Sequence, residues 1–239
     1  FPGPGRNTAM SLRVTFLGTS GAIPTTDRNP SSLFLRRSGE AFLFDVGEGT
    51  QRQMMQFGTG FDVDAVFLTH VHGDHVLGLP GLIQTWGFNG RTDPLVVYTP
   101  QGTRTSVVEL IHTVGTDPAY PVTVEEVAPG SVIREREEYE IRAIEVQHDA
   151  PAVGYALREA DRKGRFDRER AEELGVPAGH EGEAVELEDG TVVEPDQVVG
   201  PPRPGRTVLY TGDTRPVDSV ERAAADADLL IHDATFADE

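Results

Sequence analysis

Three of the seven histidines and one aspartate lie within a single stretch of six residues, which reads HVHGDH. Side chains two apart in an extended strand point the same way, so His70 and His72 can bind one cation. Gly73 permits a sharp turn, after which Asp74 and His75 can bind a second cation. Nitrogen and oxygen ligands of this kind suit Zn²⁺. The alternative, a polar loop with incidental histidines, does not account for such a density of imidazoles.

Further ligands must come from elsewhere, and three candidates each follow a predicted strand. Asp213 follows the apolar residues 208–210, where a carboxylate is well placed to bridge two metals. His148 follows residues 141–146 and has a similar position. His232 follows residues 229–231 and is itself followed by Asp233. This last pair could be metal ligands, a supporting pair outside the ligand shell, or the cap of a strand.

Asp45 ends another predicted strand, directly before the turn Gly47-Glu48-Gly49. We expect Asp45 to hold a ring nitrogen of the histidine segment from outside the ligand shell. The glycine turn either supports the metal site or begins the next helix. His112, in a predicted helix, is interpreted as structural, and His180 as solvated. The chain has no cysteine, which excludes thiolate ligands and a cysteine nucleophile.

The charge balance restricts the partners that this chain can bind. Asp and Glu number 39 against 21 Lys and Arg, the formal net charge is −18, and Lys163 is the only lysine. This composition suggests the cytoplasm of a halophile, where molar salt shortens the Debye length to about 3 Å. The alternative is an ordinary acidic cytoplasmic enzyme. Electrostatic binding of nucleic acid would require a local basic patch or high salt. No apolar run is long enough to span a membrane, and no secretory signal is apparent.

Apolar runs and turn residues predict mixed strands and helices, which favours an α/β sandwich over an all-β barrel. Strands are expected at 14–17, 32–37, 41–46, 65–68, 95–98, 122–127, 141–146, 154–158, 208–210 and 229–231. Helices are expected at 50–57, 79–86, 103–114, 166–174 and 219–225. Residues 128–140 are expected to form a charged loop, and residues 179–205 have the poorest core content. We interpret residues 1–9 as a non-native leader and residues 10–239 as one domain that starts at Met10.

Several motifs accompany the histidine segment. They read FLGTSGAIP from Phe16 with RN at Arg28-Asn29, FDVGEGTQ from Phe44, LGLPG from Leu77, GDTR from Gly212 and HDATF from His232. His148 with Gly154-Tyr155 belongs to the same set. Together these motifs resemble the metallo-β-lactamase superfamily, whose mark is a His-x-His-x-Asp-His loop. Within it they closely resemble the ribonuclease Z family of tRNA 3′-end processing endonucleases, over residues 14–236.

The resemblance implies an αββα sandwich with two Zn²⁺ ions per subunit. One metal would be bound by His70, His72 and His148. The second would be bound by Asp74 and His75, with Asp213 bridging the two. Asp74 would also act in catalysis by orienting or deprotonating the attacking water.

The resemblance also implies partners and supporting residues. The substrate would be precursor tRNA, cut to leave a 3′-hydroxyl, by a cytoplasmic homodimer with no membrane contact. Arg28 and Asn29 would contact the RNA. His232 and Asp233 would join Asp45 outside the ligand shell.

Four departures from the family pattern qualify these expectations. Thr26 stands where the family often has Lys, and Asp233 where Glu is usual. The protruding tRNA-binding arm is expected to be shortened near residues 176–190, with residues missing between Gly179 and His180. The C-terminal part of the fold, including a further metal-binding histidine, is expected to lie beyond Glu239, which would leave the second metal position incomplete and the metal content below two.

Two other functions remain open from the sequence. One is a different hydrolase of the same fold, such as an arylsulfatase-like enzyme or a phosphodiesterase. The other is a non-catalytic RNA-binding relative. The complete set of ligands from His70 to Asp213 counts against the non-catalytic alternative. The arm region and the Arg28-Asn29 loop favour RNA as the substrate.

Overall fold

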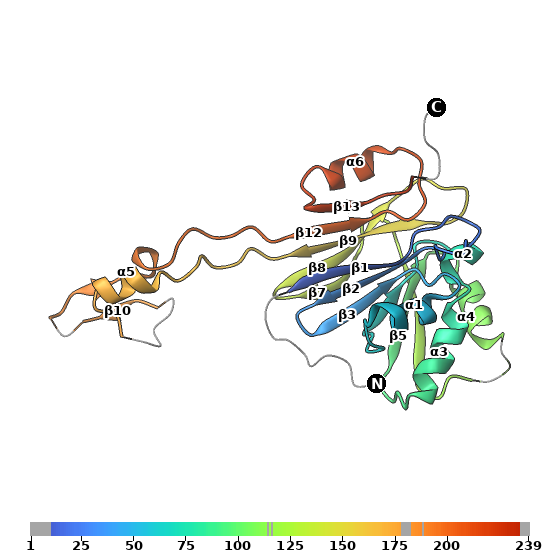
Figure 1. Ribbon diagram of the computed structural model, residues 1–239. Helices are drawn as coiled ribbons and strands as arrows, with labels where there is room; N and C mark the ends of the chain where they lie inside the picture. The colour runs from blue at the N-terminus through green and yellow to red at the C-terminus, as the bar shows by residue number, and fades with distance from the viewer. Residues whose placement is uncertain (1–10, 114, 116, 178–182, 188, 235–239) are drawn as a thin grey trace.

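Two β-sheets pack face to face in the computed structural model, with helices on their outer faces and a long arm that projects from one end (Figure 1). The structure describes residues 11–113, 115, 117–177, 183–187 and 189–234. The proposed leader and the suspected break between Gly179 and His180 lie outside these residues. The α/β sandwich expected from the sequence is confirmed. Within the described residues, no helix is long and apolar enough to cross a bilayer.

The first sheet has six strands in the order β1 to β6. Its strands are β1 (Leu12–Gly18), β2 (Ser32–Arg37), β3 (Glu40–Phe44), β4 (Ala65–Phe67), β5 (Leu95–Pro100) and β6 (Val122–Val127). The connecting helices are α1 (Thr50–Phe57), α2 (Gly73–Val76), α3 (Leu79–Phe88) and α4 (Arg104–His112). Strands β1 to β3 are antiparallel, whereas β3 to β6 are parallel. The carboxyl ends of the parallel strands therefore meet at one edge, where ligands commonly bind.

The second sheet has the order β13-β12-β9-β8-β7. Its strands are β7 (Val132–Arg136), β8 (Tyr139–Glu145), β9 (Val153–Glu159), β12 (Thr207–Tyr210) and β13 (Leu229–Ile231), and α6 (Asp218–Ala224) connects the last two. Strand β7 corrects the expected charged loop over 128–140. Its sequence, VIRER, lies at the sheet edge with no fully buried residue, so it lacks the apolar run of a core strand.

Successive side chains along the strands of the first sheet point to opposite faces, so the sheet contributes to two hydrophobic cores. Phe42, Phe44 and Phe67 face the second sheet, where Phe67 contacts Tyr155 at a ring-centroid distance of 5.3 Å. Leu43 and Val66 point the other way, toward the helices. Each strand end is therefore held by packing on both faces, and the loops that follow start from fixed positions.

The arm comprises residues 160–206 and has two parts. Its stalk, residues 160–166 and 199–206, continues the antiparallel pair β9 and β12 away from the body (Figure 1). Its head, residues 167–198, contains α5 (Arg168–Glu173), β10 (Val185–Glu186), β11 (Val192–Val193) and the 3₁₀ helix η1 (Pro195–Gln197). The head has a small apolar core of Ala171, Val176, Val185, Val193 and Val198. Because residues 178–182 are not described, the expected shortening near 176–190 stays a prediction.

Candidate metal centre

The candidate ligands lie in loops that follow strands of both sheets. After β4, the chain passes through His70 and the extended residue His72 into α2, which carries Asp74 and His75. Gly73 begins this helix, and the chain turns here from the extended His72 into α2, with His75 N donating to His72 O at 3.0 Å. A Cβ atom on Gly73 would lie only 3.0 Å from Leu77 Cδ1, so the small residue suits a close helix start.

One group of potential ligands consists of His70, His72 and His148. Each offers a ring nitrogen, and the three atoms lie within 4.8 Å of one another. His148 Nε2 lies 3.2 Å from His72 Nδ1, although the two residues are far apart in the sequence. The second sheet thus delivers its histidine to the pair on the first sheet.

A second group consists of His70, His75 and Asp213. His75 Nε2 lies 3.3 Å from Asp213 Oδ1 and 3.5 Å from Asp74 Oδ2. Within the described residues His75 Nε2 has no hydrogen-bond partner, so both contacts are ion pairs only. Asp213 therefore groups with His70 and His75, while His72 and His148 lie on the other side of the shared His70.

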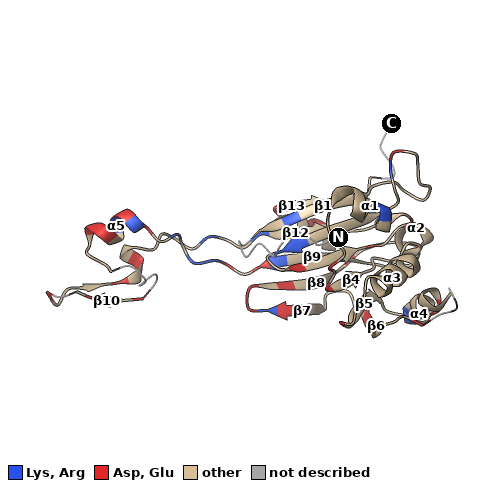
Figure 2. Ribbon diagram, turned by 60° about the horizontal axis from the view of Figure 1, so that its bottom comes forward, with Lys and Arg blue, Asp and Glu red and all other residues tan. Residues whose placement is uncertain are grey.

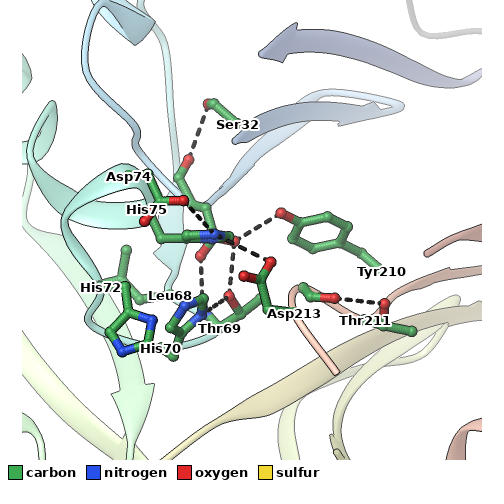
Figure 3. A network of polar contacts seen from close by, with 12 residues as sticks. Ser32, Leu68, Thr69, His70, His72, Asp74, His75, Tyr210, Thr211 and Asp213 are labelled. Carbon is green, nitrogen blue, oxygen red and sulfur yellow. Dashed lines mark hydrogen bonds and ion pairs between the residues drawn. The ribbon is translucent and has the colours of Figure 1, made fainter. Parts of the chain in front are cut away.

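Asp45 holds the second group in place through hydrogen bonds, and Figure 3 shows two of the side chains that it binds, His75 and Tyr210, on opposite sides of this network. Its buried Oδ2 atom accepts hydrogen bonds from His75 Nδ1, Thr69 Oγ1 and Tyr210 OH, each at 2.8 Å, and Oδ1 accepts one from Thr69 N at 2.7 Å. The bond from Nδ1 leaves Nε2 of His75 free to face Asp213, which sets the ring orientation that a metal ligand needs. Asp45 adopts a positive φ of 53°, a conformation that costs a non-glycine residue energy.

Thr69 and Tyr210 were not identified from the sequence. Tyr210 ends β12 inside an apolar run, and a buried tyrosine hydroxyl needs a hydrogen-bonding partner, which was the available signal. That partner, Asp45, lies 165 positions away in the sequence. Thr69 directly precedes the histidine segment, but its role as a donor depends on the fold.

The two groups fit a bound cation because they contain polar atoms that the protein leaves unsatisfied. Among the described residues, His70 Nε2 and His75 Nε2 are buried and have no hydrogen-bond partner. A buried polar atom without a partner costs about 1–3 kcal/mol. Both atoms belong to the groups defined above, where a metal ion would satisfy them. The donor set of imidazoles and carboxylates is one that divalent transition metals accept.

Electrostatics differ sharply between these two histidines. Burial, reinforced by the charge of His75, lowers the pKa of His70 to about 4, so its ring is neutral at pH 7 and its lone pair can bind a metal. Burial also disfavours charge on His75, but Asp45 and Asp213 outweigh it and raise its pKa to about 10. The contact with His75 in turn lowers the pKa of Asp213. The carboxylates around His75 therefore create a potential that favours a cation.

A cleft of about 680 Å³ opens beside Asp213. Its lining includes Arg28, Tyr210, His232 and Asp233. His232 lies outside both ligand groups and its Nδ1 atom is 3.0 Å from Thr211 Oγ1. The cleft is thus open to a substrate that reaches the metal centre from this side.

Arg28 and Asn29, the expected RNA contacts, differ in their environments. Arg28 is exposed at the cleft. Both ends of the Asn29 amide are engaged within the protein: Nδ2 donates to Glu48 O at 2.9 Å, and Oδ1 accepts from the Gln53 side chain. Asn29 therefore holds the turn that begins α1 at Gly49, and Arg28 is the better placed of the two to contact a ligand.

Comparisons with known proteins agree with this geometry. Residues 25–236 match the metallo-beta-lactamase superfamily. A ribonuclease Z from Halobacterium salinarum is 63% identical over 236 residues, which cover 96% of this chain and 77% of that protein. A ribonuclease Z from Natronomonas pharaonis is 65% identical over 234 residues, covering 95% and 76%. The crystal structure of human tRNase Z, short form, has a TM-score of 0.66 at 27% identity, covering 94% of this chain and 79% of that one. The archaeal sources are halophiles, in agreement with the acidic composition.

Proposed function

Because the chain belongs to the ribonuclease Z family of the metallo-beta-lactamase superfamily, we propose that its two ligand groups hold Zn²⁺ for the 3′ processing of precursor tRNA. The chain is a tRNA 3′-processing endoribonuclease, as its relatives and its structural neighbour indicate. The observation that carries the zinc proposal is the pair of buried, unsatisfied nitrogens on His70 and His75.

We assign one Zn²⁺ to His70, His72 and His148, and a second to His75 and Asp213 with Asp74 beside them. Zinc bound there would lower the pKa of a water molecule and stabilise negative charge on the attacked phosphate. The neutral ring of His70 and the oriented ring of His75 suit this role. Elemental analysis of bound zinc decides between two ions per chain and the content below two that the sequence leads us to expect. A count near one would limit the assignment to the three-histidine group.

Protein groups would carry the remaining chemistry. The carboxylate of Asp74 would orient the attacking water and accept its proton. The water oxygen forms a bond to phosphorus as the bond to the tRNA 3′ oxygen breaks. A proton then goes to that oxygen, which leaves a 3′-hydroxyl on the tRNA and a 5′-phosphate on the trailer. Arg28, exposed at the cleft, would bind a phosphate of the acceptor end.

RNA binding by a chain of net charge −18 needs a local basic surface, and the stalk provides one (Figure 2). Arg162, Lys163, Arg165 and Arg203 lie on its two strands, and the exposed Arg158 lies next to them on β9. The head is acidic, with Asp167, Glu169, Glu172, Glu173, Glu183, Glu186, Asp189, Glu194 and Asp196. We infer that RNA phosphates contact the stalk. Arginine keeps directional, bidentate hydrogen bonds to phosphate, which suits binding at high salt.

The family resemblance also supports a cytoplasmic homodimer. Light scattering of the purified chain in molar KCl would measure its mass, and a value near 25.9 kDa would exclude the dimer.

The function is tested with a precursor tRNA that carries a 3′ trailer, in about 2 M KCl, where the Debye length is only a few Å. The Zn²⁺-loaded chain should release the trailer with a 5′-phosphate, and a chelator should abolish the reaction. Bis(p-nitrophenyl) phosphate, a small diester, serves as a second substrate. Hydrolysis of the diester without any cleavage of the tRNA would favour another hydrolase of this fold. Inactivity on both substrates would favour the non-catalytic alternative.

A further inference from the structure

The stalk is a narrow two-stranded ribbon that little else supports. Arg162 and Arg203 exchange backbone hydrogen bonds of 2.8 Å in both directions, and Gly200 N donates to Arg165 O at 2.9 Å. The strands approach so closely that a Cβ atom on Gly205 would lie 1.8 Å from Glu159 O. Among the described residues, none between 160 and 165 belongs to a core cluster of the body. An isolated two-stranded ribbon is marginally stable and twists easily.

A buried carboxylate lies where this ribbon leaves the body. Glu159, the last residue of β9, is 3% exposed. It accepts hydrogen bonds from Arg206 on the returning strand, Nε to Oε2 at 2.6 Å and Nη2 to Oε1 at 3.0 Å. This two-point contact fixes the relative direction of the two planar groups. Glu159 thus ties together the two strands at the base of the stalk.

The same carboxylate is tied to the other sheet. Arg37, at the end of β2, donates from Nε to Glu159 Oε1 at 3.1 Å and is 5% exposed. Its guanidinium lies 4.6 Å from the Tyr139 ring centroid, and Nη2 donates to Glu138 O at 3.2 Å. These contacts hold Arg37 in place. Glu159 therefore joins both stalk strands to the sheet that carries the histidine segment.

We propose that Glu159 is a positioning residue that sets the direction of the arm relative to the metal centre. The role rests on the proposed function, because arm direction matters only to a substrate that contacts the stalk and the metal centre together. A strand rises about 3.3 Å per residue, so six stalk residues span roughly 20 Å, and a 10° rotation at the base would move the head by about 3–4 Å. A displacement of that size is enough to misplace a bound substrate.

The first test measures arm direction without RNA. The chain has no cysteine, so Glu172→Cys in α5 and Glu109→Cys in α4 provide two specific sites for spin labels. Pulsed electron spin resonance should give a narrow distance distribution for the parent protein. Glu159→Gln keeps the shape of the side chain but removes its charge, and the distribution should become at least about twice as broad or shift by several Å. An unchanged distribution would overturn the proposal.

The second test separates positioning from a purely structural role. With the Zn²⁺-loaded full chain, Glu159→Gln should raise KM for precursor tRNA about tenfold and leave kcat within about twofold. Hydrolysis of bis(p-nitrophenyl) phosphate, which does not reach the arm, should stay at the parental rate. Equal losses on both substrates would show that the variant damages the body and would refute the positioning role.

Two further variants complete the design. Arg206→Lys keeps the charge but loses the two-point contact, so it should reproduce the KM effect, and it replaces Glu159→Gln should that variant fail to fold. Glu173→Gln breaks the exposed pair with Arg170 in the head and should change nothing. Cleavage of precursor tRNA by the parent protein is measured alongside. Its absence would count against the proposed function, whereas the distance measurement would still decide the role of Glu159.

Discussion

Two buried polar clusters, one around Asp45 and one around Glu159, are built from similar groups but have different roles: the first is a candidate ligand site and the second a structural junction. Each centres on a carboxylate that joins the two sheets. Around Glu159, the two carboxylate oxygens are paired with the guanidinium groups of Arg37 and Arg206. Around Asp45, the ring nitrogens His70 Nε2 and His75 Nε2 are buried and have no hydrogen-bond partner in the described part of the chain. The difference separates a cluster that is complete within the protein from one that a ligand must complete.

The cost of folding follows the same division. The unsatisfied nitrogens and the positive φ of Asp45 destabilise the metal-free protein, and a bound cation would offset this cost by satisfying the nitrogens. The Glu159 cluster would gain no such stabilisation from a ligand, because its contacts already exist in the folded chain. Removing one partner from each cluster should therefore affect function at the first and stability or substrate binding at the second.

The largest expected effect is on catalysis at the cluster around Asp45. His72→Ala should reduce cleavage of precursor tRNA by more than about 10³-fold, since a ligand-deficient zinc site loses both water activation and charge stabilisation. The circular dichroism spectrum should stay native. Elemental analysis should show less bound zinc. Turnover close to the parent level would remove His72 from the metal centre, and His112→Ala, in the exposed part of α4, serves as the matched control.

The next effect is on the free energy of unfolding, at the cluster around Glu159. Glu159→Ala leaves Arg37 buried without its partner, which should lower the free energy of unfolding by about 3 kcal/mol. Urea denaturation in molar KCl measures the change. Glu173→Ala, whose side chain is 66% exposed, should stay within about 0.5 kcal/mol of the parent. A similar small change for Glu159→Ala would mean that the cluster contributes little to stability.

A smaller effect is expected when the supporting carboxylate of the metal centre is altered. Asp45→Asn should weaken zinc binding about 10–100-fold, because His75 loses the charged acceptor that orients its ring. Competition with a chromophoric chelator measures the affinity. Asp64→Asn is the control, since the Asp64 carboxylate accepts a hydrogen bond from Ala41 N, remote from the histidines. Equal zinc affinities for both variants would contradict the role of Asp45.

The smallest effect concerns pH. Burial alone would raise the pKa of Glu159, but Arg206, Arg37 and Arg162 outweigh it and hold the pKa below its usual range. The ionised carboxylate therefore stabilises the fold above the unfolded pKa of about 4.3, and this contribution is lost as pH falls through the lower folded value. The stability difference between the parent and Glu159→Gln should be constant from pH 7 to about 5 and shrink below about pH 4. A difference that grew on acidification would reverse the sign of the shift.

The sequence located most of the metal centre because its ligands follow apolar strands. Buried strands end at predictable places, so His70, His148 and Asp213 could each be assigned to a strand end. The family resemblance implied the division into two groups, but not that His70 belongs to both, which depends on how the two sheets face each other. The two hydrogen bonds of the Asn29 amide were missed for the same reason. Gln53, which donates to Asn29 Oδ1, lies on α1, 24 positions further along the sequence.

No sequence pattern predicts the cluster around Glu159. Glu159 lies 122 positions from Arg37 and 47 from Arg206, and no local pattern distinguishes these charges from solvated ones. Strand β7 and the short strands of the head were missed because they lie at edges or around a minor core, where alternation is weak. The local periodicity of apolar residues thus predicts elements that pack on the main cores. It does not predict those that depend on a few long-range polar contacts.

The hydrogen-bonded base of the stalk has a consequence for how this chain can vary. Glu159 N donates to Arg206 O at 2.9 Å, so the chain leaves the sandwich and returns to it at adjacent points. Residues 160–206 are in effect an insertion within a hairpin. Exchanging them for a turn about ten times shorter would change the loop-closure entropy by only about 2 kcal/mol, in favour of the shorter chain. The sandwich should therefore tolerate arms of very different length, and substrate preference could diverge between relatives without redesign of the catalytic body.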